Sequence, residues 1–389
     1  MQPFYICSGY MEQFLKDIQV FSPAMLLFWG LVIALLIQLW YFLWYFIRPA
    51  KKMAEPAPES YPPVSVIICA RNEDDNLVAF LPAVLSQDYP EFEVVVVNDC
   101  SFDNTGDILK EFAAKHNHLK VVTIKEDEYY QHGKKVALMM GIKGATYEHL
   151  LHTDADCKPS SDQWLKKMAA HFTAGKEIVL GYGPYIKNGS MLNKLIRFDA
   201  FVIALNYFSF ALARNPYMGV GRNLAYTKSL FYKNKGFASH YHIESGDDDL
   251  FVNEAATSSN TAVVLNKDAF TYSLPKKYFR DWWRQKKRHL QTGGRYKAKH
   301  KFLLAFYPFS QWLFFGCFTT LLIFKFQLYV VLGIFLFRLL AQMLIFNVTM
   351  KKFGERDLLV FVPLFEIFFL FFYPVIIISR KLQRKRRWT

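Results

Sequence analysis

The sequence predicts an α/β domain with a mostly parallel central sheet, joined at both ends to helices long enough to cross a membrane. Two observations carry this prediction. Between residues 64 and 152, apolar β-branched runs alternate with helical stretches, a pattern typical of βαβ units. At both ends of the chain lie uncharged or nearly uncharged apolar blocks, each close to the roughly 20 residues that a membrane-spanning helix needs.

Composition limits the class of protein. The 389 residues are 52% hydrophobic and 17% aromatic, which excludes a disordered chain and a collagen-like one. Five cysteines are too few for a disulfide framework in a chain of this length, so we expect reduced thiols that face the cytosol or lipid. The net charge is +14. The basic tail, residues 380–389, could bind a nucleic acid, but its position next to an apolar block favours contact with anionic lipid.

The N-terminal part predicts one membrane span after a segment of residues 1–23. Residues 24–47 carry no charge, and a cluster of Trp and Tyr at their end is followed by Arg48, Lys51 and Lys52. This order is typical of an interfacial aromatic belt with positive charges on the cytoplasmic side. A cleavable signal peptide is the alternative, but the apolar stretch is too long for one and no small-residue cleavage site follows it.

Three further apolar blocks, residues 302–324, 327–348 and 358–379, predict a C-terminal membrane region of about three helices over residues 302–379. Arg338 and Glu366 lie inside these blocks; the Arg either snorkels, pairs with Glu366, or has a functional role. Four spans in total would leave the basic tail, residues 380–389, on the side opposite Arg48, against the positive-inside rule. Either one block lies in the interface or is re-entrant, or the rule fails here.

Residues 48–63 read as a Pro-rich linker to the polar middle of the chain. Strands and helices then alternate. Strands are predicted at residues 64–69, 92–97, 119–124 and 148–152, and helices at residues 76–87, 103–115 and 134–145.

Acidic residues follow three of these strands. Glu73 comes after the first strand, Asp99 after the second, and Asp154 and Asp156 after the fourth. Because ligands bind beyond the carboxyl ends of parallel strands, we expect the four side chains to share one edge of the sheet. Asp is also an ordinary turn residue, so each alone has a structural explanation.

The pair Asp154-x-Asp156 is the strongest metal candidate. Hard carboxylate oxygens suit Mg²⁺ or Mn²⁺, which keep coordination sites open for substrate phosphates. A zinc site is the rival interpretation, but no second Cys/His pair stands at the required spacing. Cys157 then reads as a small packing residue.

Seven motifs occur in a fixed order over roughly residues 60–290: VSVIICARNE, VVVNDCS, HGKK, TDAD, GVGRN, GDDD and Gln285-Lys286-Lys287-Arg288-His289. In this the chain resembles the membrane-anchored family 2 glycosyltransferases, which include hyaluronan, chitin and cellulose synthases and ceramide glucosyltransferase. The resemblance implies a GT-A fold over residues 64–290, a nucleotide-diphospho-sugar donor, with a UDP-sugar as the expected one, and inversion at the anomeric carbon.

The resemblance also assigns roles on the donor side. The nucleotide would be held by Ala70, Arg71, Glu73, Asp99 and the Lys134 of the Gly-Lys pair. Asp154 and Asp156 look like the metal-binding pair, with Asp156 the more direct ligand.

On the other side, Asp248 looks like the catalytic base, with Asp247 beside it. Gln285 and Arg288 match a Q-x-x-R-W element in which His289 replaces the Trp. The acceptor side is assigned to Gly219, Gly221 and Asn223. We expect Trp282 and Trp283, just upstream of Gln285, to substitute for the replaced Trp on the acceptor side.

These residue types fit the chemistry of glycosyl transfer. Charge develops on the leaving diphosphate, which a divalent ion and the planar fork of Arg288 can neutralise. A carboxylate such as Asp248 can take the acceptor's proton, and repulsion among the three Asp side chains raises one pKa toward neutrality. The alternative for the GDDD segment is a helix cap, which suits Asp247 best.

Two more segments favour the membrane surface. Residues 191–214 are apolar and aromatic with a few charges, and residues 278–290 mix aromatics with cations. A single-stranded nucleic acid could bind such a mixture, but the position before the C-terminal blocks favours interfacial helices.

The sequence therefore predicts an inverting, metal-dependent β-glycosyltransferase in a bacterial inner membrane, with its catalytic domain in the cytoplasm. The acceptor would be a lipid or a glycan, and no nucleic-acid partner is expected. A processive polysaccharide synthase, which would need an oligomer or a channel partner, and an inactive scaffold are the alternatives. A nucleotide-sugar transporter is excluded by the large polar middle.

Overall fold

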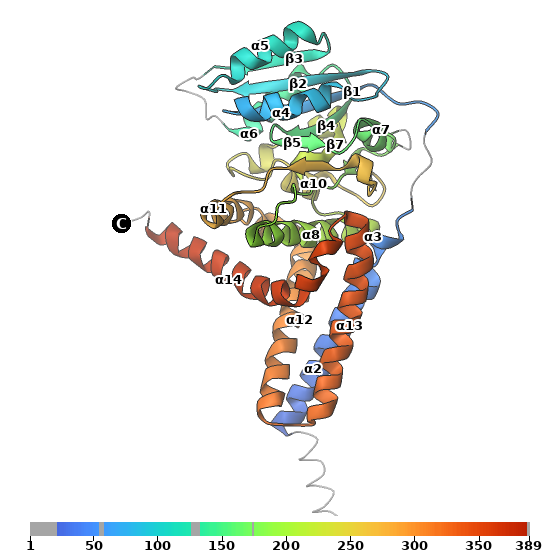
Figure 1. Cartoon of the computed structure of the whole chain (residues 1–389), viewed down its shortest axis with the longest axis vertical. Helices are drawn as coiled ribbons and strands as arrows, with labels where there is room; N and C mark the ends of the chain where they lie inside the picture. The colour runs from blue at the N-terminus through green and yellow to red at the C-terminus, as the bar shows by residue number, and fades with distance from the viewer. Residues whose placement is uncertain (1–21, 54–57, 126–132, 173–174, 387–389) are drawn as a thin grey trace, which may run out of the picture.

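The computed structural model describes residues 22–53, 58–125, 133–172 and 175–386 (Figure 1). The N-terminal segment up to residue 21, the middle of the linker, His132 of the HGKK motif and residues 387–389 of the tail lie outside this part.

A seven-stranded sheet forms the centre of the polar domain. Its strands are β1 (Val64–Ala70), β2 (Phe92–Asp99), β3 (Leu119–Ile124), β4 (His149–Asp154), β6 (Ile178–Leu180), β7 (Leu224–Thr227) and β8 (Thr261–Val263). The spatial order is β3-β2-β1-β4-β7-β6-β8; β4–β7 and β7–β6 pair antiparallel, and the other pairs are parallel. The mostly parallel sheet predicted from the sequence is confirmed.

Both faces of this sheet are covered, which explains why its strands read as continuous apolar runs. On β1, Val64, Val66 and Ile68 belong to one hydrophobic core and Ile67 belongs to the other. The early helices are α4 (Asp74–Leu85), α5 (Thr105–Lys115) and α6 (Lys134–Gly144). Helix α4 continues through Pro82.

The second half of the domain is made of shorter elements. A two-stranded sheet pairs β5 (Cys157–Pro159) with β9 (Thr271–Ser273). The remaining elements are α7 (Trp164–Ala169), η3 (Gly221–Asn223), α9 (Lys228–Lys233), η4 (Ala238–His240), α10 (Asp249–Ala255), η5 (Lys267–Ala269), α11 (Phe279–His289) and η6 (Gly293–Arg295).

Five helical segments of the described chain are long and apolar enough to cross a membrane. They contain α2 (Pro23–Trp40) with η1 (Tyr41–Phe46) and α3 (Arg48–Lys51), then α8 (Met191–Leu212), α12 (Ala298–Ile323), α13 (Leu328–Phe353), and η7 (Arg356–Phe361) with α14 (Val362–Arg386). These segments indicate association with a membrane.

The five segments do not share one direction. Helices α2, α12 and α13 pack together along the long axis of the molecule, whereas α8 and α14 run across it, between this bundle and the polar domain (Figure 1). The block at residues 358–379 therefore does not continue the bundle as a fourth parallel helix. As a result, α3 and the described end of α14 lie on the side of the bundle that faces the polar domain.

A buried polar cluster joins the bundle to α14. Arg338 Nη1 donates to Glu366 Oε2 at 2.7 Å, and its Nε donates to Gln38 Oε1 of α2 at 2.7 Å. Gln311 of α12 donates to Glu366 Oε1 at 2.6 Å. Of the interpretations open for Arg338, pairing with Glu366 is the one that the structure has. A buried charge without such partners would cost several kcal/mol.

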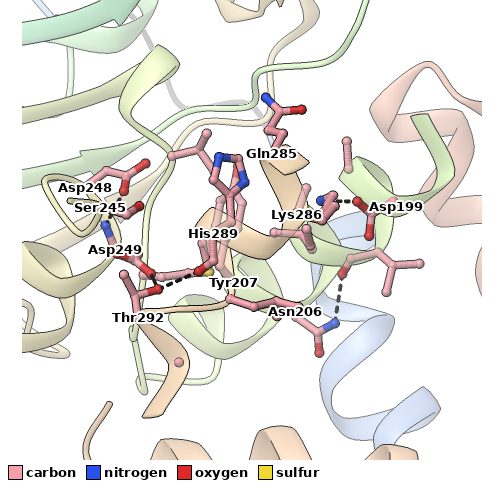
Figure 2. A pocket seen from close by; sticks show the side chains of 18 of the residues that line it. Asp199, Asn206, Tyr207, Ser245, Asp248, Asp249, Gln285, Lys286, His289 and Thr292 are labelled. Atoms are coloured by element: carbon pink, nitrogen blue, oxygen red, sulfur yellow. Dashed lines mark hydrogen bonds and ion pairs between the residues drawn. The ribbon is translucent and has the colours of Figure 1, made fainter. Parts of the chain in front are cut away.

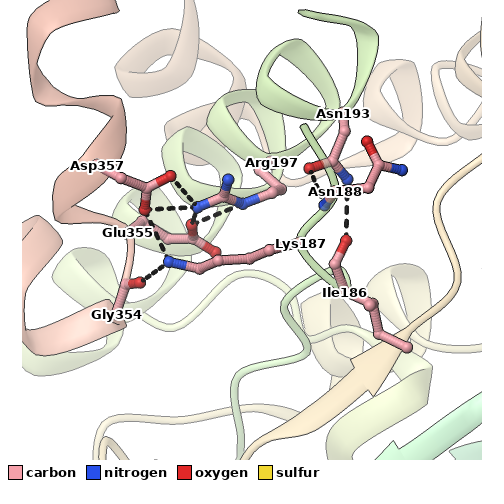
Figure 3. Close-up of polar contacts among 8 residues, drawn as sticks. All are labelled: Ile186, Lys187, Asn188, Asn193, Arg197, Gly354, Glu355 and Asp357. Atoms are coloured by element: carbon pink, nitrogen blue, oxygen red, sulfur yellow. Dashed lines mark hydrogen bonds and ion pairs between the residues drawn. The ribbon is translucent and has the colours of Figure 1, made fainter. Parts of the chain in front are cut away.

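A second ion cluster fixes α8 (Figure 3). The guanidinium of Arg197 donates to Glu355 and to Asp357 Oδ1, the latter at 2.7 Å. Lys187 donates to the same Asp357 oxygen at 2.7 Å and to the carbonyl of Gly354 at 2.8 Å. This cluster attaches α8 to the connection between α13 and η7.

Candidate active site

One cavity of about 1130 Å³ extends from the carboxyl edge of the sheet to the apolar helices. Twelve of the residues predicted from the sequence line it. They are Ala70, Arg71, Glu73, Asp99, Lys134, Asp154, Asp156, Gly221, Asp247, Asp248, Gln285 and Arg288. Residues separated by more than 200 positions in the chain thus meet around a single space.

The loops after β1 and β2 are bonded to each other at one end of this cavity. The backbone N–H of Asn72 donates to Ser101 Oγ at 3.0 Å, and Asn72 Oδ1 accepts from Phe102 N at 3.0 Å. Both Asn72 and Cys100 have left-handed backbone (φ 56° and 52°), which turns each loop sharply at its strand end. These contacts hold Arg71 and Glu73 next to Asp99.

Asp99 has an unused acceptor. Its side chain is buried, and Oδ1 has no hydrogen-bond partner among the described residues. A buried carboxylate oxygen without a partner is costly, so this atom is suited to an N–H donor of a ligand. Across the cavity edge, Glu73 accepts from Asn76 Nδ2 at 2.5 Å, and burial raises the pKa of Glu73.

Lys134 connects two of the predicted acidic motifs. Its Nζ lies 2.7 Å from Asp154 Oδ1 and 3.5 Å from Asp247 Oδ2. Burial alone would lower the pKa of Lys134, but the two carboxylates outweigh it and hold that pKa well above its usual range. The lysine is therefore charged and places the strand β4 end beside the GDDD segment.

The carboxylates at the end of β4 and in the turn after it fit a divalent cation. Ligand atoms of Asp154, Asp156 and Cys157 all lie within 4.8 Å of one another. Asp154 is already bonded to Lys134, whereas Asp156 Oδ1 has only long contacts, at 3.4 Å from Ser273 Oγ and 3.5 Å from Cys157 Sγ. Burial and the neighbouring Asp154 raise the pKa of Asp156, a repulsion that a bound cation would relieve. The buried Cys157 thiol has its pKa raised by burial, which does not favour a thiolate ligand.

Asp248 is held by two backbone donors. Oδ2 accepts from Gly221 N at 2.8 Å and Oδ1 accepts from Asp249 N at 2.7 Å. Burial first, and then repulsion from Asp247 and Asp249, raise the pKa of Asp248 to about 7. Each carboxylate oxygen keeps a second lone pair, so the group can still accept a proton from a ligand in the cavity.

The third acid of GDDD has a different role. Asp249 Oδ2 accepts from Tyr296 Oη at 2.5 Å and also from the Thr292 hydroxyl (Figure 2). These bonds connect α10 to the segment after α11. Asp249 is thus bonded within the protein. The helix cap that we expected at Asp247 is instead Asp248, the N-cap residue of α10, so the proposed base also caps this helix.

Helix α11 brings Gln285, Arg288 and His289 to the cavity. Within the described chain, the guanidinium of Arg288 makes no hydrogen bond or ion pair, and it lies at a wall where a phosphate could bind. Figure 2 shows the His289 ring between Asp248 and Lys286. Burial, together with Lys286 and Arg288, lowers the pKa of His289 to about 3, so the ring is neutral at physiological pH.

The contacts that hold α11 in place were not predicted from the sequence. Lys286 forms an ion pair with Asp199 of α8, and Asp199 also accepts from the Tyr373 hydroxyl of α14. Three helices meet at this carboxylate. Lys286 stood inside the predicted element, but nothing in the local sequence identified Asp199 or Tyr373 as its partners.

Arg222 is a second residue that we did not single out. Its guanidinium lies 4.3 Å from the centre of the Tyr185 ring, and both residues line the cavity. Its carbonyl accepts from Thr153 Oγ1 at 3.0 Å and Thr271 Oγ1 at 2.8 Å. The available signal was the cation inside the GVGRN motif.

Four predicted acceptor residues do not line the cavity. Asn223 donates to the carbonyls of Tyr182 and Ala269, both at 2.8 Å, and an added side-chain atom at Gly219 would meet Leu224 at 2.9 Å. Trp282 is fully buried and stacks on Phe372 of α14 at 4.8 Å; Trp283 contacts the same ring at 5.4 Å. These four residues therefore pack behind the side chains that line the cavity.

The family model described as Glycosyl transferase family 2 matches residues 65–234, which contain the β1, β2 and β4 ends and the GVGRN motif. Residues 65–234 are thus similar in sequence to glycosyltransferase family 2. This family 2 domain ends before the GDDD segment, so the assignment of Asp248 depends on its position in the cavity.

Known proteins resemble the chain over different lengths. A poly-beta-1,6-N-acetyl-D-glucosamine synthase of Staphylococcus epidermidis is 39% identical over 93 residues, 24% of this chain and 21% of that protein. The probable glycosyltransferase YdaM of Bacillus subtilis is 28% identical over 270 residues, 64% of this chain and 59% of that protein. The chain therefore spans less than two thirds of the length of either relative.

Among solved structures, the mannosyltransferase PcManGT from Pyrobaculum calidifontis, in complex with GDP-Man and Mn²⁺, superimposes with a TM-score of 0.56. The match covers 87% of this chain and 95% of that one at 19% identity. At this identity the similarity concerns the fold, and it confirms the GT-A architecture around the family 2 domain.

Proposed function

We propose that this enzyme transfers a sugar from a nucleotide-diphospho-sugar to an acceptor hydroxyl or phosphate with inversion at the anomeric carbon. The observation that carries the proposal is Asp248, which has a pKa of about 7 and lies in the same cavity as Asp99, Asp156 and Arg288. A base, a nucleotide anchor, a metal candidate and a free cation are the parts that the reaction requires.

The donor would lie along the sheet edge. Asp99 Oδ1, which has no partner among the described residues, would accept an N–H of the base, with Arg71 and Glu73 beside it. A UDP-sugar remains our expected donor. The mannosyltransferase of the same fold was solved with a GDP-sugar, so the nucleotide has to be tested rather than assumed.

Asp156, supported by Asp154, would hold Mg²⁺ or Mn²⁺ against the diphosphate. When bound, the ion neutralises phosphate charge as the leaving group departs. The Arg288 guanidinium would bind two phosphate oxygens from the other side, as its planar geometry allows.

Asp248 takes the proton of the acceptor as the acceptor oxygen attacks the anomeric carbon from the face opposite the diphosphate. The bond between that carbon and the phosphate oxygen breaks, and the nucleoside diphosphate leaves with the electron pair. A carboxylate with a pKa near the working pH is effective in this role.

We also propose an orientation in the membrane. Helices α2, α12 and α13 would span it, with α8 and α14 at the interface. Arg48, Lys51 and the C-terminal cations would then share the cytoplasmic side with the catalytic domain, in agreement with the positive-inside rule. In this proposed orientation the topology conflict would disappear, because α14 would not carry the tail across the membrane.

The acceptor would be a lipid or a glycan. Similarity to a polysaccharide synthase over 93 residues favours a processive enzyme as the second candidate. The length of the product separates the two, because a single added sugar excludes processive synthesis.

A donor panel tests the proposal. The full chain, purified in detergent with Mn²⁺, would be incubated with UDP-, GDP- and other nucleotide-sugars, and nucleotide release would be measured. We expect release with one donor and its loss in Asp248→Asn. No release with any donor would instead support an inactive scaffold.

A further inference from the structure

The cavity continues past Asp248 into a chamber between the apolar helices. Helix α14 contributes Glu366, Phe369, Leu370, Tyr373, Pro374 and Ile377. These positions follow the 3.6-residue period of a helix, so one face of α14 lines the cavity. We call this part the lower chamber.

Helix α12 closes the opposite wall. Lys301, Leu304, Ala305, Pro308 and Trp312 line the cavity, again with helical spacing. Helix α8 lies above and adds Val202, Ile203 and Asn206. The lower chamber is thus bordered by three helices that are each apolar enough to cross a membrane.

Several polar side chains of the lower chamber are already bonded within the protein. Glu366 is paired with Arg338 and accepts from Gln311. Gln342 Oε1 accepts from Arg338 at 2.9 Å, and Asn206 Nδ2 donates to the carbonyl of Val202 at 2.8 Å. Sugar hydroxyls need free hydrogen-bonding partners on the protein, whereas a hydrocarbon chain does not, so this lining suits a hydrocarbon.

Two cations that line the cavity and have no ion pair in the described part of the chain stand toward its upper end. Lys301 lies at the start of α12, and Arg288 lies on α11; among the described residues neither forms an ion pair. A ligand with an anionic or hydroxyl head and an apolar tail would match this gradient, with its head near Asp248.

We propose that the lower chamber holds the hydrocarbon chain of a membrane lipid whose head group is the acceptor. The inference rests on the proposed function and makes it more specific. The lipid would enter where α12 and α14 meet the bilayer, and its head would reach Asp248 without leaving the membrane surface.

Photolabelling tests occupancy of the chamber. An alkyl phosphate with a diazirine at the end of its chain would be added to the full chain in detergent, and the labelled residues mapped by mass spectrometry. We expect labels on the chamber faces of α12 and α14. In Ala305→Trp the larger side chain fills the chamber. Labelling there should fall about tenfold or more, because the probe loses apolar contact equal to that of one buried side chain.

Thr319→Trp is the matched control, because Thr319 lies on the exposed surface of the same helix and does not line the cavity. It should label as the wild type does. Leu304→Trp is a second chamber variant in case Ala305→Trp does not fold, and donor binding verifies folding in each.

Chain-length dependence tests whether the occupant is the acceptor. With n-alkyl phosphates and n-alkyl glucosides from butyl to decyl, below their micelle concentrations, acceptor-stimulated nucleotide release should rise about fourfold per methylene. The rise should be lost in Ala305→Trp and kept in Thr319→Trp.

Release that is indifferent to chain length, or faster with a soluble oligosaccharide than with any alkyl acceptor, would overturn this inference and leave the proposed function standing. A chamber that labels as expected in a protein that releases no nucleotide from any donor would overturn the proposed function instead.

Discussion

The backbone N–H of Gly221 donates a 2.8 Å hydrogen bond to Oδ2 of Asp248. Gly221 belongs to the GVGRN motif and Asp248 to the GDDD motif, 27 residues later in the chain. A Cβ atom at Gly221 would lie 3.4 Å from Asp248 Oδ2, so the backbone at Gly221 is packed directly against the carboxylate. The two motifs form one unit that fixes the orientation of the proposed base.

Asp248→Asn removes that base while keeping the shape of the side chain. We expect turnover to fall roughly 10²–10⁴-fold, the usual contribution of a general base, with donor affinity unchanged. Nucleotide release and calorimetric donor binding measure the two effects separately. Asp249→Asn is a contrasting variant, since its bonds to Thr292 and Tyr296 give it a structural role. Comparable turnover in Asp248→Asn and the wild type would contradict the base assignment.

The raised pKa of Asp248 predicts a pH profile. Because the base must be ionised and its folded pKa is about 7, kcat/KM should fall as pH decreases through about 7, by roughly tenfold per unit below it. Donor affinity measured over the same range separates this effect from titration of the metal-side carboxylates. A flat profile around neutral pH would show that another group takes the proton.

Asp156→Ala should abolish the metal-dependent part of donor binding. Asp156 has no short hydrogen bond within the described structure, so its loss removes a ligand without breaking the fold. Calorimetry with and without Mn²⁺ measures the difference. Asp162→Ala, an exposed acid outside the cavity, is the control. Equal Mn²⁺-dependent affinity in the variant and the wild type would rule out this ligand.

Trp282 is expected to matter for stability as well as for catalysis. It is fully buried and stacks on Phe372 at 4.8 Å, so Trp282→Ala should cost about 3–5 kcal/mol, measured by thermal unfolding in detergent. Trp283→Ala, at a half-buried neighbour, should cost less. Trp282→Phe should restore most of the loss and, with it, the placement of Gln285 and Arg288. Full stability of Trp282→Ala would mean that α11 does not depend on α14.

The ion pair between Arg338 and Glu366 predicts a non-additive pair of substitutions. Glu366→Leu leaves a buried cation and should destabilise the protein by about 3–5 kcal/mol. Adding Arg338→Met removes that cation, so the double variant should be more stable than Glu366→Leu alone. Unfolding temperatures of the two singles and the double measure the coupling. Additive losses would indicate that the pair is not an energetic unit.

The strands and the polar loops after them could be predicted because their signals are local. Parallel strands buried on both faces read as apolar runs, and the acids after β1, β2 and β4 follow each run directly. The topology of the sheet then brings Glu73, Asp99 and Asp154 together without any long-range information.

The acceptor side could not be predicted in the same way. Asn223 stands in the GVGRN motif and Trp282 lies just upstream of Gln285. Bonds to Tyr182 and Ala269 decide where the Asn223 side chain points, and packing against α14 decides where Trp282 points. The direction of α14 could not be predicted from the sequence either, because its composition matches that of a membrane-spanning helix. Two tertiary contacts distinguish α14 from a spanning helix. The Tyr373 hydroxyl donates a hydrogen bond to Asp199, and Phe372 stacks on Trp282; both contacts hold α14 against the domain.

The interior of the three-helix bundle has a consequence for where the product goes. Leu31, Phe314, Cys317, Leu321 and Val331 fill it with packed apolar side chains, so this part of the chain offers no conduit along α2, α12 and α13. In the proposed orientation, whatever is glycosylated stays in the leaflet where it was made. Delivery to the outer surface of the cell would then fall to a separate flippase or exporter.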